Sequence, residues 1–92
     1  MTEKEKLGIY LTSLRKDIKS SDYIDRSISQ QELADKTKGL SKNTLLSIEN
    51  GSANPTLDSL IILANALNQD KLNIFNISID VKKYIKENNL DF

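Results

Sequence analysis

The sequence predicts an all-α protein, a small five-helix bundle whose C-terminal end forms a short helix or a strand. Apolar residues recur at helical spacing in successive segments of the chain. Each of the first four segments is preceded by a residue that can cap a helix: Thr2, Ser29, Ser41 and Thr56. The length of 92 residues fits one small domain near the lower limit for a self-sufficient core, so a core shared in an oligomer would add stability.

The first predicted helix begins near Thr2 and ends at about Ile18. Its apolar residues give one face that can lie beneath the following helices: Leu7, Tyr10, Leu11, Leu14 and Ile18. A polar loop then runs from residue 19 to residue 27. We expect its apolar residues, Tyr23 and Ile24, to pin the loop to the domain; the alternative is a contact with a partner or an adjacent phosphate.

The next two helices are predicted between residues 29 and 51. Ser29 and Glu32 have the spacing of a capping box, so a helix should begin at Gln30. The apolar residues beside the box are placed as a hydrophobic staple: Ile28 and Leu33. Gly39 can adopt the positive φ that ends this helix after Lys38.

Ser41 then caps a second helix, and Leu40 and Leu45 repeat the staple pattern. At about 100° per residue, one side of this helix must face the core: Leu45, Ile48 and the stem of Glu49. The other side carries short hydrogen-bonding side chains at a spacing that can reach neighbouring base edges: Asn43, Ser47 and Asn50.

After a turn that contains the proline, Thr56 caps a predicted helix that runs from Leu57 to about Asn68. Its core stripe consists of five residues: Leu57, Leu60, Leu63, Ala64 and Leu67. Ile61 and Ile62 widen this stripe beyond what one core needs. We interpret the excess as a partner contact, with coverage by the long loop as the alternative.

The tail fits two patterns. One is the alternation of a strand, over Phe75, Ile77, Ile79 and Val81, and the other is a helix face, over Ile77, Val81, Tyr84 and Ile85. We favour a short helix from about Asp80 to Asn88 that follows an extended segment. Either form leaves an apolar side that dimerisation would bury. We therefore divide the chain into a domain over residues 1–75 and a C-terminal dimerisation element over residues 76–92.

Composition narrows the function classes. The chain has no cysteine or histidine, and we find no phosphate-binding glycine loop, metal-ligand cluster or nucleophile with a base, so we expect no enzyme, no cofactor and no bound metal. No small-molecule substrate is evident. The charged N-terminus and the short longest apolar run, Leu60 to Ala64, argue against a signal peptide or a membrane span, which leaves the cytoplasm as the expected location.

Thirteen basic residues balance thirteen acidic ones, and no basic tail is present. This neutral balance argues mildly against nucleic-acid binding in general. Specific binding can still rest on a few well-placed cations and backbone amides, because the local potential at the docking face matters more than the total.

The segment from residue 29 to residue 51 resembles the helix-turn-helix of the Cro/phage-repressor family, also called the xenobiotic-response-element type. The resemblance rests on Gln30, Leu33, Ala34, Gly39, Ser41, Leu45, Ile48, Glu49 and Gly51, and it extends over roughly Leu7 to Phe75. Relative to that pattern the chain has one extra residue between Ala34 and Gly39 and an insertion of about eight residues in the 19–27 loop. The resemblance implies a phage-repressor type of bundle whose second motif helix lies in the major groove of DNA.

The resemblance also implies roles for individual residues. Those expected to face base edges are Lys42, Asn43 and Ser47, with Leu46 against a thymine methyl. Those expected to hold phosphates are Gln30, Thr44, Asn50 and Ser52. Arg15 is expected to support the site by pairing with Glu49. The alternatives are ordinary: Asn43 or Arg15 solvated, Ser47 bonded to a carbonyl, and Leu46 packed on the first motif helix.

The function expected from the resemblance is sequence-specific regulation of transcription, as a repressor that binds double-stranded operator DNA with two-fold symmetry as a homodimer. The alternative is a protein-interaction module, such as an antitoxin or an adaptor, that retains the same fold. The neutral charge keeps this alternative open, whereas the polar face of the second motif helix favours DNA.

Overall fold

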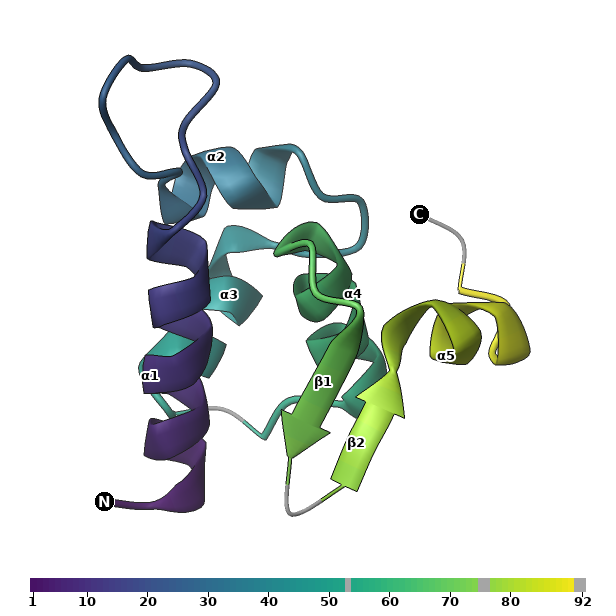
Figure 1. Cartoon of the computed structure of the whole chain (residues 1–92). Helices are drawn as coiled ribbons and strands as arrows, with labels where there is room; N and C mark the ends of the chain where they lie inside the picture. Colours follow the sequence, from purple (N-terminus) through teal and green to yellow (C-terminus); the bar gives the residue numbers. More distant parts are fainter. Residues whose placement is uncertain (53, 75–76, 91–92) are drawn as a thin grey trace.

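The computed structural model describes residues 1–52, 54–74 and 77–90 of the chain. These residues form a mostly helical fold with one small sheet (Figure 1). In chain order the elements are α1 (Glu3–Lys16), α2 (Gln30–Asp35), α3 (Lys42–Glu49), α4 (Leu57–Ala66), β1 (Lys71–Ile74), β2 (Ile77–Asp80) and α5 (Val81–Glu87). The predicted all-α class is therefore correct only in part, because a two-stranded hairpin stands between α4 and α5.

Local capping explains where the first four helices begin. The side chains of Thr2, Ser29, Ser41 and Thr56 each accept a hydrogen bond from the backbone N–H three residues later. A full capping box forms at Thr2 and Glu5. The box predicted at Ser29 and Glu32 forms only in half, because the Glu32 carboxylate binds the preceding loop instead of the Ser29 backbone.

Three predicted helix ends were wrong. The first motif helix, α2, ends at Asp35 and not at Lys38. Just beyond this end, the Thr37 hydroxyl donates to the Leu33 carbonyl at 2.7 Å. Gly39 has a φ of +86°, as expected, but it lies in the following turn. Similarly, α1 ends at Lys16 and α4 ends at Ala66, each two residues before the predicted end.

The core contains side chains from α1, α2, α3, α4, β1 and α5. Its fully buried side chains are Leu11, Leu45, Ile61, Leu63, Leu67, Leu72 and Val81. Gly8 allows the close contact between α1 and α3, because an added Cβ would lie 2.3 Å from the backbone oxygen of Glu49. The interpretation of Ile61 as a partner contact was wrong, since this side chain is entirely buried within one chain. Ile62 is half-buried beside Gly39. The 19–27 loop, which was the alternative cover for Ile61 and Ile62, forms hydrogen bonds with α2.

The tail combines the two patterns found in its sequence. Strand β2 pairs with β1 in antiparallel register, with Leu72 opposite Ile79 and Ile74 opposite Ile77. Asp80 then caps α5 by accepting from the Lys83 N–H, so the predicted short helix after an extended segment is confirmed. The parts of these expectations that concern Phe75 and Asn76 lie outside the described residues.

The C-terminal helix α5 is bound tightly to the rest of the chain. Val81 is completely buried, and its N–H donates to the Asp70 carbonyl at 2.9 Å. The Tyr84 hydroxyl donates to the Asp58 carboxylate at 2.7 Å, which raises the pKa of Tyr84. The tail therefore completes the core of its own chain by covering α4.

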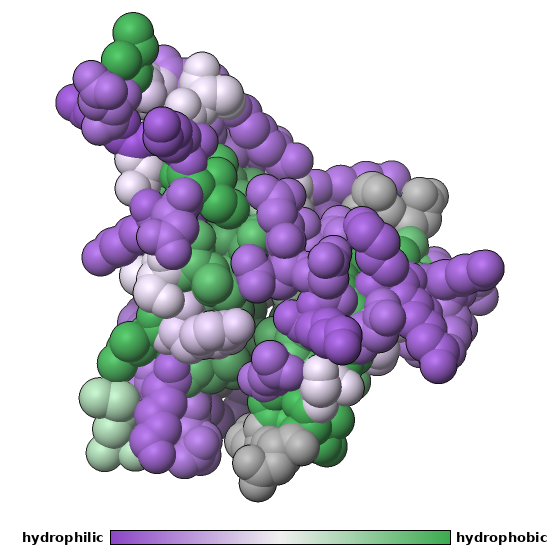
Figure 2. Space-filling view, viewed as in Figure 1, coloured by the Kyte–Doolittle hydropathy of each residue, from purple (hydrophilic) through white to green (hydrophobic). Residues whose placement is uncertain are grey.

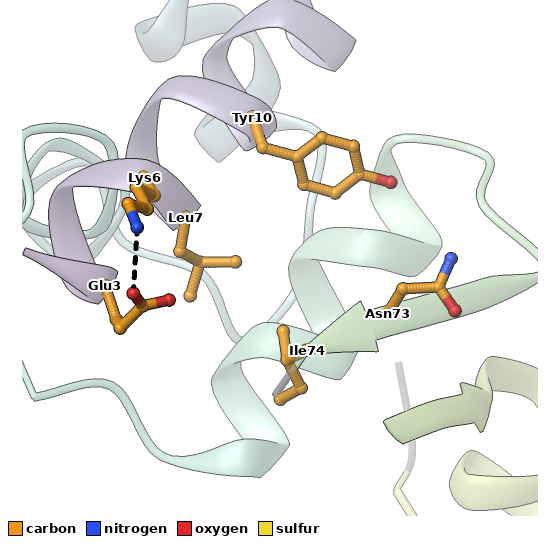
Figure 3. Close-up of a pocket in the computed structure, with 6 residues that line it drawn as sticks. All are labelled: Glu3, Lys6, Leu7, Tyr10, Asn73 and Ile74. Atoms are coloured by element: carbon orange, nitrogen blue, oxygen red, sulfur yellow. Dashed lines mark hydrogen bonds and ion pairs between the residues drawn. The ribbon is translucent and has the colours of Figure 1, made fainter. Parts of the chain in front are cut away.

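A shallow cleft separates the N-terminal half of α1 from β1 (Figure 3). Leu7 and Tyr10 extend from α1 into it, and Asn73 and Ile74 border it on the hairpin side. Its charged groups, Lys6 and Glu3, form an exposed ion pair within α1 at 3.1 Å. The lining of this cleft thus consists of packing residues and one surface ion pair.

Candidate nucleic-acid interface

Helix α3 has one buried side and one polar side, as the sequence predicted. Leu45 and Ile48 are buried in the core. The other side chains are exposed or half-buried: Lys42, Asn43 and Asn50 exposed, Thr44, Leu46 and Ser47 half-buried. The polar side thus carries one cation and several short side chains that both donate and accept hydrogen bonds.

A shallow groove runs beside this polar side, between α3 and the start of α4. On the α3 side it is lined by Asn43, Thr44 and Ser47, and on the other side by Asn54, Pro55, Thr56 and Ser59. Most of these side chains are small and polar. The region around Asn43 and Ser47 is therefore accessible, and it offers amide and hydroxyl groups but no carboxylate.

The residues expected at phosphates have particular neighbours within the chain. The Gln30 amide nitrogen donates to Glu49 at 3.0 Å, and the Asn50 amide oxygen accepts from the Ser52 N–H at 3.0 Å. The Thr44 hydroxyl accepts from Ser41 at 2.9 Å. These bonds orient the side chains, and each amide nitrogen still has an N–H that can donate to another group.

The Glu49 carboxylate joins the three helices around the polar side of α3. Arg15 from α1 pairs with it through two nitrogens, Nε to Oε2 at 2.8 Å and Nη2 to Oε1 at 3.0 Å. Thr12 of α1 and Gln30 of α2 also donate to Oε1, each at 3.0 Å. Only 5% of the Glu49 side chain and 11% of the Arg15 side chain are exposed.

Burial alone would raise the pKa of Glu49. The hydrogen bonds from Arg15, Gln30 and Thr12, together with the charge of Arg15, outweigh burial and hold this pKa below its ordinary value. Arg15 also donates through Nη1 to the Ile28 carbonyl at 2.8 Å. We call this group of residues, Thr12, Arg15, Gln30 and Glu49, the Glu49 cluster. It fixes the position of α3 relative to α1 and α2.

A second buried carboxylate was not anticipated from the sequence. Glu32 on α2 accepts from the Ser20 hydroxyl at 2.5 Å and from the Ser21 N–H at 3.0 Å. It also pairs with Lys36 at 2.9 Å, and Lys36 contacts Ser21 and Asp22 as well. We call this group, Ser20, Ser21, Glu32 and Lys36, the Glu32 cluster.

The hydrogen bond from Ser20, followed by that from Lys36, lowers the pKa of Glu32 to about 2. The sequence contained one signal for this cluster, the spacing of Glu32 and Lys36 at i and i+4 on a helix. The two serines that complete it lie in the preceding loop, so their approach depends on the path of that loop.

The loop between α1 and α2 projects beyond the body of the protein (Figure 1). Ile24 is 89% exposed and Tyr23 is 60% exposed, and hydrophobic atoms are visible at the tip of the loop in Figure 2. The prediction that these two residues pin the loop to the domain was therefore wrong. The Glu32 cluster holds the loop instead, and the guanidinium of Arg26 lies 5.4 Å from the centre of the Tyr23 ring.

The described residues contain no group of three or more potential metal-binding side chains from His, Cys, Asp and Glu. No helix among the elements α1 to α5 has both the length and the apolar character needed to cross a membrane.

Comparison with known proteins gives one family. A family model described as helix-turn-helix matches residues 24–71, which is more than half of the 92-residue chain. The match includes α2, α3 and α4 together with the loop tip and the start of β1. Searches of curated proteins and of solved structures found no match.

Proposed function

Because the chain belongs to the helix-turn-helix family of the Cro/phage-repressor type, whose members are DNA-binding regulators of transcription, we propose that it represses transcription as a homodimer on a two-fold related operator. The observation that carries this proposal is the polar side of α3. The side chains on this side of α3 are exposed or half-buried. The Glu49 cluster holds α3 in one orientation relative to α1 and α2. A rigid support of this kind is what base reading requires, because hydrogen bonds to base edges tolerate little displacement.

In this proposal the first turn of α3 reads bases. Lys42 suits guanine O6 and N7, and Asn43 can donate to and accept from one adenine. Ser47 lies one turn further along the same side, and the half-buried Leu46 is placed to contact a thymine methyl. Lys42 and Asn43 are exposed, which supports their assignment to base edges. Leu46 is half-buried, so its assignment has less support.

The phosphate contacts are assigned to Gln30, Thr44, Asn50 and Ser52. Gln30 and Asn50 border one hollow of the surface together with Leu46. Since the oxygen of Asn50 accepts from Ser52, its amide nitrogen is the group that would donate to phosphate. Gln30 would use the second N–H of the nitrogen that already donates to Glu49.

We assign the dimer contact to the tail, residues 76–92, and specifically to β2. Ile77 is 59% exposed on the same side of the hairpin as the buried Leu72, so the apolar side of the sheet extends beyond the core. The outer edge of a strand also offers unpaired backbone groups to a second strand. Pairing of two β2 strands across a two-fold axis would use both features.

A point substitution tests the dimer better than removal of the tail, because the tail covers α4. Ile77→Lys should shift the protein from dimer to monomer in light scattering at tens of micromolar, and the unfolding midpoint should fall only by the stability that dimerisation adds. Ile77 is largely exposed within one chain, so only an interface would respond to the charge. A wild-type protein that is already monomeric at this concentration would contradict the proposed dimer.

A protein-interaction module such as an antitoxin or an adaptor is the second candidate. Two observations favour it: the formal net charge of zero and the exposed apolar tip of the 19–27 loop. Binding to a random DNA pool followed by sequencing separates the candidates. The proposal predicts enrichment of an inverted repeat with half-sites about 10 base pairs apart. If no sequence is enriched, sequence-specific DNA binding is excluded and the interaction module becomes the better account.

A further inference from the structure

The inserted loop of residues 19–27 is built as a fixed projection of the domain. At its base the Ser20 N–H donates to the Arg26 carbonyl at 2.8 Å, and the Ile28 N–H donates to the Ile18 carbonyl at 2.7 Å. The Ser27 hydroxyl donates to the Lys16 carbonyl at 2.6 Å. Together with the Glu32 cluster, these bonds attach both ends of the loop to α1 and α2.

The loop adjoins the candidate DNA surface through Lys16, the last residue of α1. Lys16 lines the hollow that also contains Gln30, Leu46 and Asn50. The same residue lines a second hollow, which contains Lys19 and Arg26 of the loop. The cationic side chains of the loop therefore continue the surface on which the bases and phosphates of a half-site are proposed to lie.

The charges of the loop are divided between its two sides. On the side that faces α2, the negative charges of Glu32 and Asp22 are both close to Lys36. The ion pairs found within the described residues do not include Lys16, Lys19 or Arg26. Asp17 and Asp25 line the second hollow as well, so this side is only slightly basic and suits a small number of phosphates.

We propose that the 19–27 loop is a second DNA-contacting element, in which Lys19 and Arg26, beside Lys16, bind backbone phosphates that flank each half-site. This inference rests on the proposed DNA-binding function. Stacking against Tyr23 limits the motion of the Arg26 guanidinium, whose N–H groups can still donate to a phosphate. Since phosphates carry no sequence information, the loop would add affinity and leave base preference unchanged.

The test compares two operator duplexes, one with long flanks and one trimmed to the two half-sites, after selection has supplied the operator. The variant is Lys19→Ala with Arg26→Ala, measured by mobility shift over a range of salt concentrations. The control is Lys4→Ala with Lys71→Ala, which removes the same charge from exposed positions, the first at the opposite end of α1 from the loop (Figure 1). Lys19→Gln with Arg26→Gln is measured in parallel, because glutamine keeps a longer polar side chain in case the alanine variant folds poorly.

On the flanked duplex the loop variants should bind about tenfold more weakly than the control, and the logarithmic salt slope should flatten by about 0.9 for each lost phosphate contact. The difference should shrink on the trimmed duplex, and base preference should not change. Equal binding by loop and control variants, or a loss of the same size on both duplexes, overturns the inference while the DNA-binding proposal stands. A wild-type protein that selects no DNA would refute the DNA-binding proposal itself.

Discussion

The buried carboxylates of Glu49 and Glu32 each accept several hydrogen bonds, but they connect different parts of the fold. Glu49 accepts hydrogen bonds from α1 and α2 and fixes the helix whose polar side is the candidate reader of DNA. Glu32 accepts them from the inserted loop and from its own helix, and fixes the loop. The comparison indicates that one cluster supports the helix-turn-helix frame, whereas the other attaches an additional element to it.

The largest difference between the clusters should appear in stability. Glu49→Ala leaves the Arg15 guanidinium nearly buried without its carboxylate, so unfolding should become easier by about 1 to 3 kcal/mol. Thermal unfolding measures this change. Glu87→Ala is the control, because it removes a carboxylate from the exposed pair with Lys83 and should have almost no effect. If the midpoints of the two variants are equal, the Glu49 cluster does not stabilise the fold.

Glu32→Ala should act locally. Its partners in the loop lie close to solvent and can be hydrated when the carboxylate is removed, so the midpoint should fall less than in Glu49→Ala. The Ser21 amide, which donates to Glu32, should lose protection from hydrogen exchange, while amides in α3 keep theirs. An unchanged exchange rate at Ser21 would show that the cluster does not hold the loop.

Acid should open the Glu32 cluster within a defined range of pH. The pKa of Glu32 is about 2 in the folded protein and 4.5 for an ordinary glutamate. A lowered pKa means that this group contributes its full stabilisation above pH 4.5 and loses it as the pH falls toward 2. Nuclear magnetic resonance titration of the Glu32 carboxyl and the Ser21 amide, with Glu32→Gln as the control, measures this. Titration of Glu32 near 4.5 would contradict the hydrogen bonds described.

The sequence predicted those features that depend on neighbouring residues. The caps at Thr2, Ser29, Ser41 and Thr56 each involve a backbone N–H three residues away, and all four start a helix as expected. The two-sided character of α3 also follows from its own spacing. These features need no knowledge of how distant segments meet.

Features that depend on distant segments were missed or misinterpreted. Glu32 satisfied the pattern of a capping box, but its carboxylate binds serines from the loop, eleven and twelve residues earlier. Ile61 looked like excess apolar surface on α4, but it is completely buried, and the contacts of α4 with α5 and β1 could not be foreseen from the local pattern. The pairing of Leu72 with Ile79 likewise requires the chain to reverse direction between them.

If the polar side of α3 reads DNA sequence, substitutions along this side should separate loss of base preference from loss of affinity. Affinities of Asn43→Ala, Lys42→Ala and Asn50→Ala are measured on the selected operator and on scrambled DNA. Asn43→Ala should cost about 1 to 3 kcal/mol on the operator and relax the preference at one position of each half-site, because a bidentate base contact is lost. Asn50→Ala should weaken both complexes about equally. If Asn43→Ala and Lys42→Ala change neither affinity nor base preference, α3 does not read the sequence.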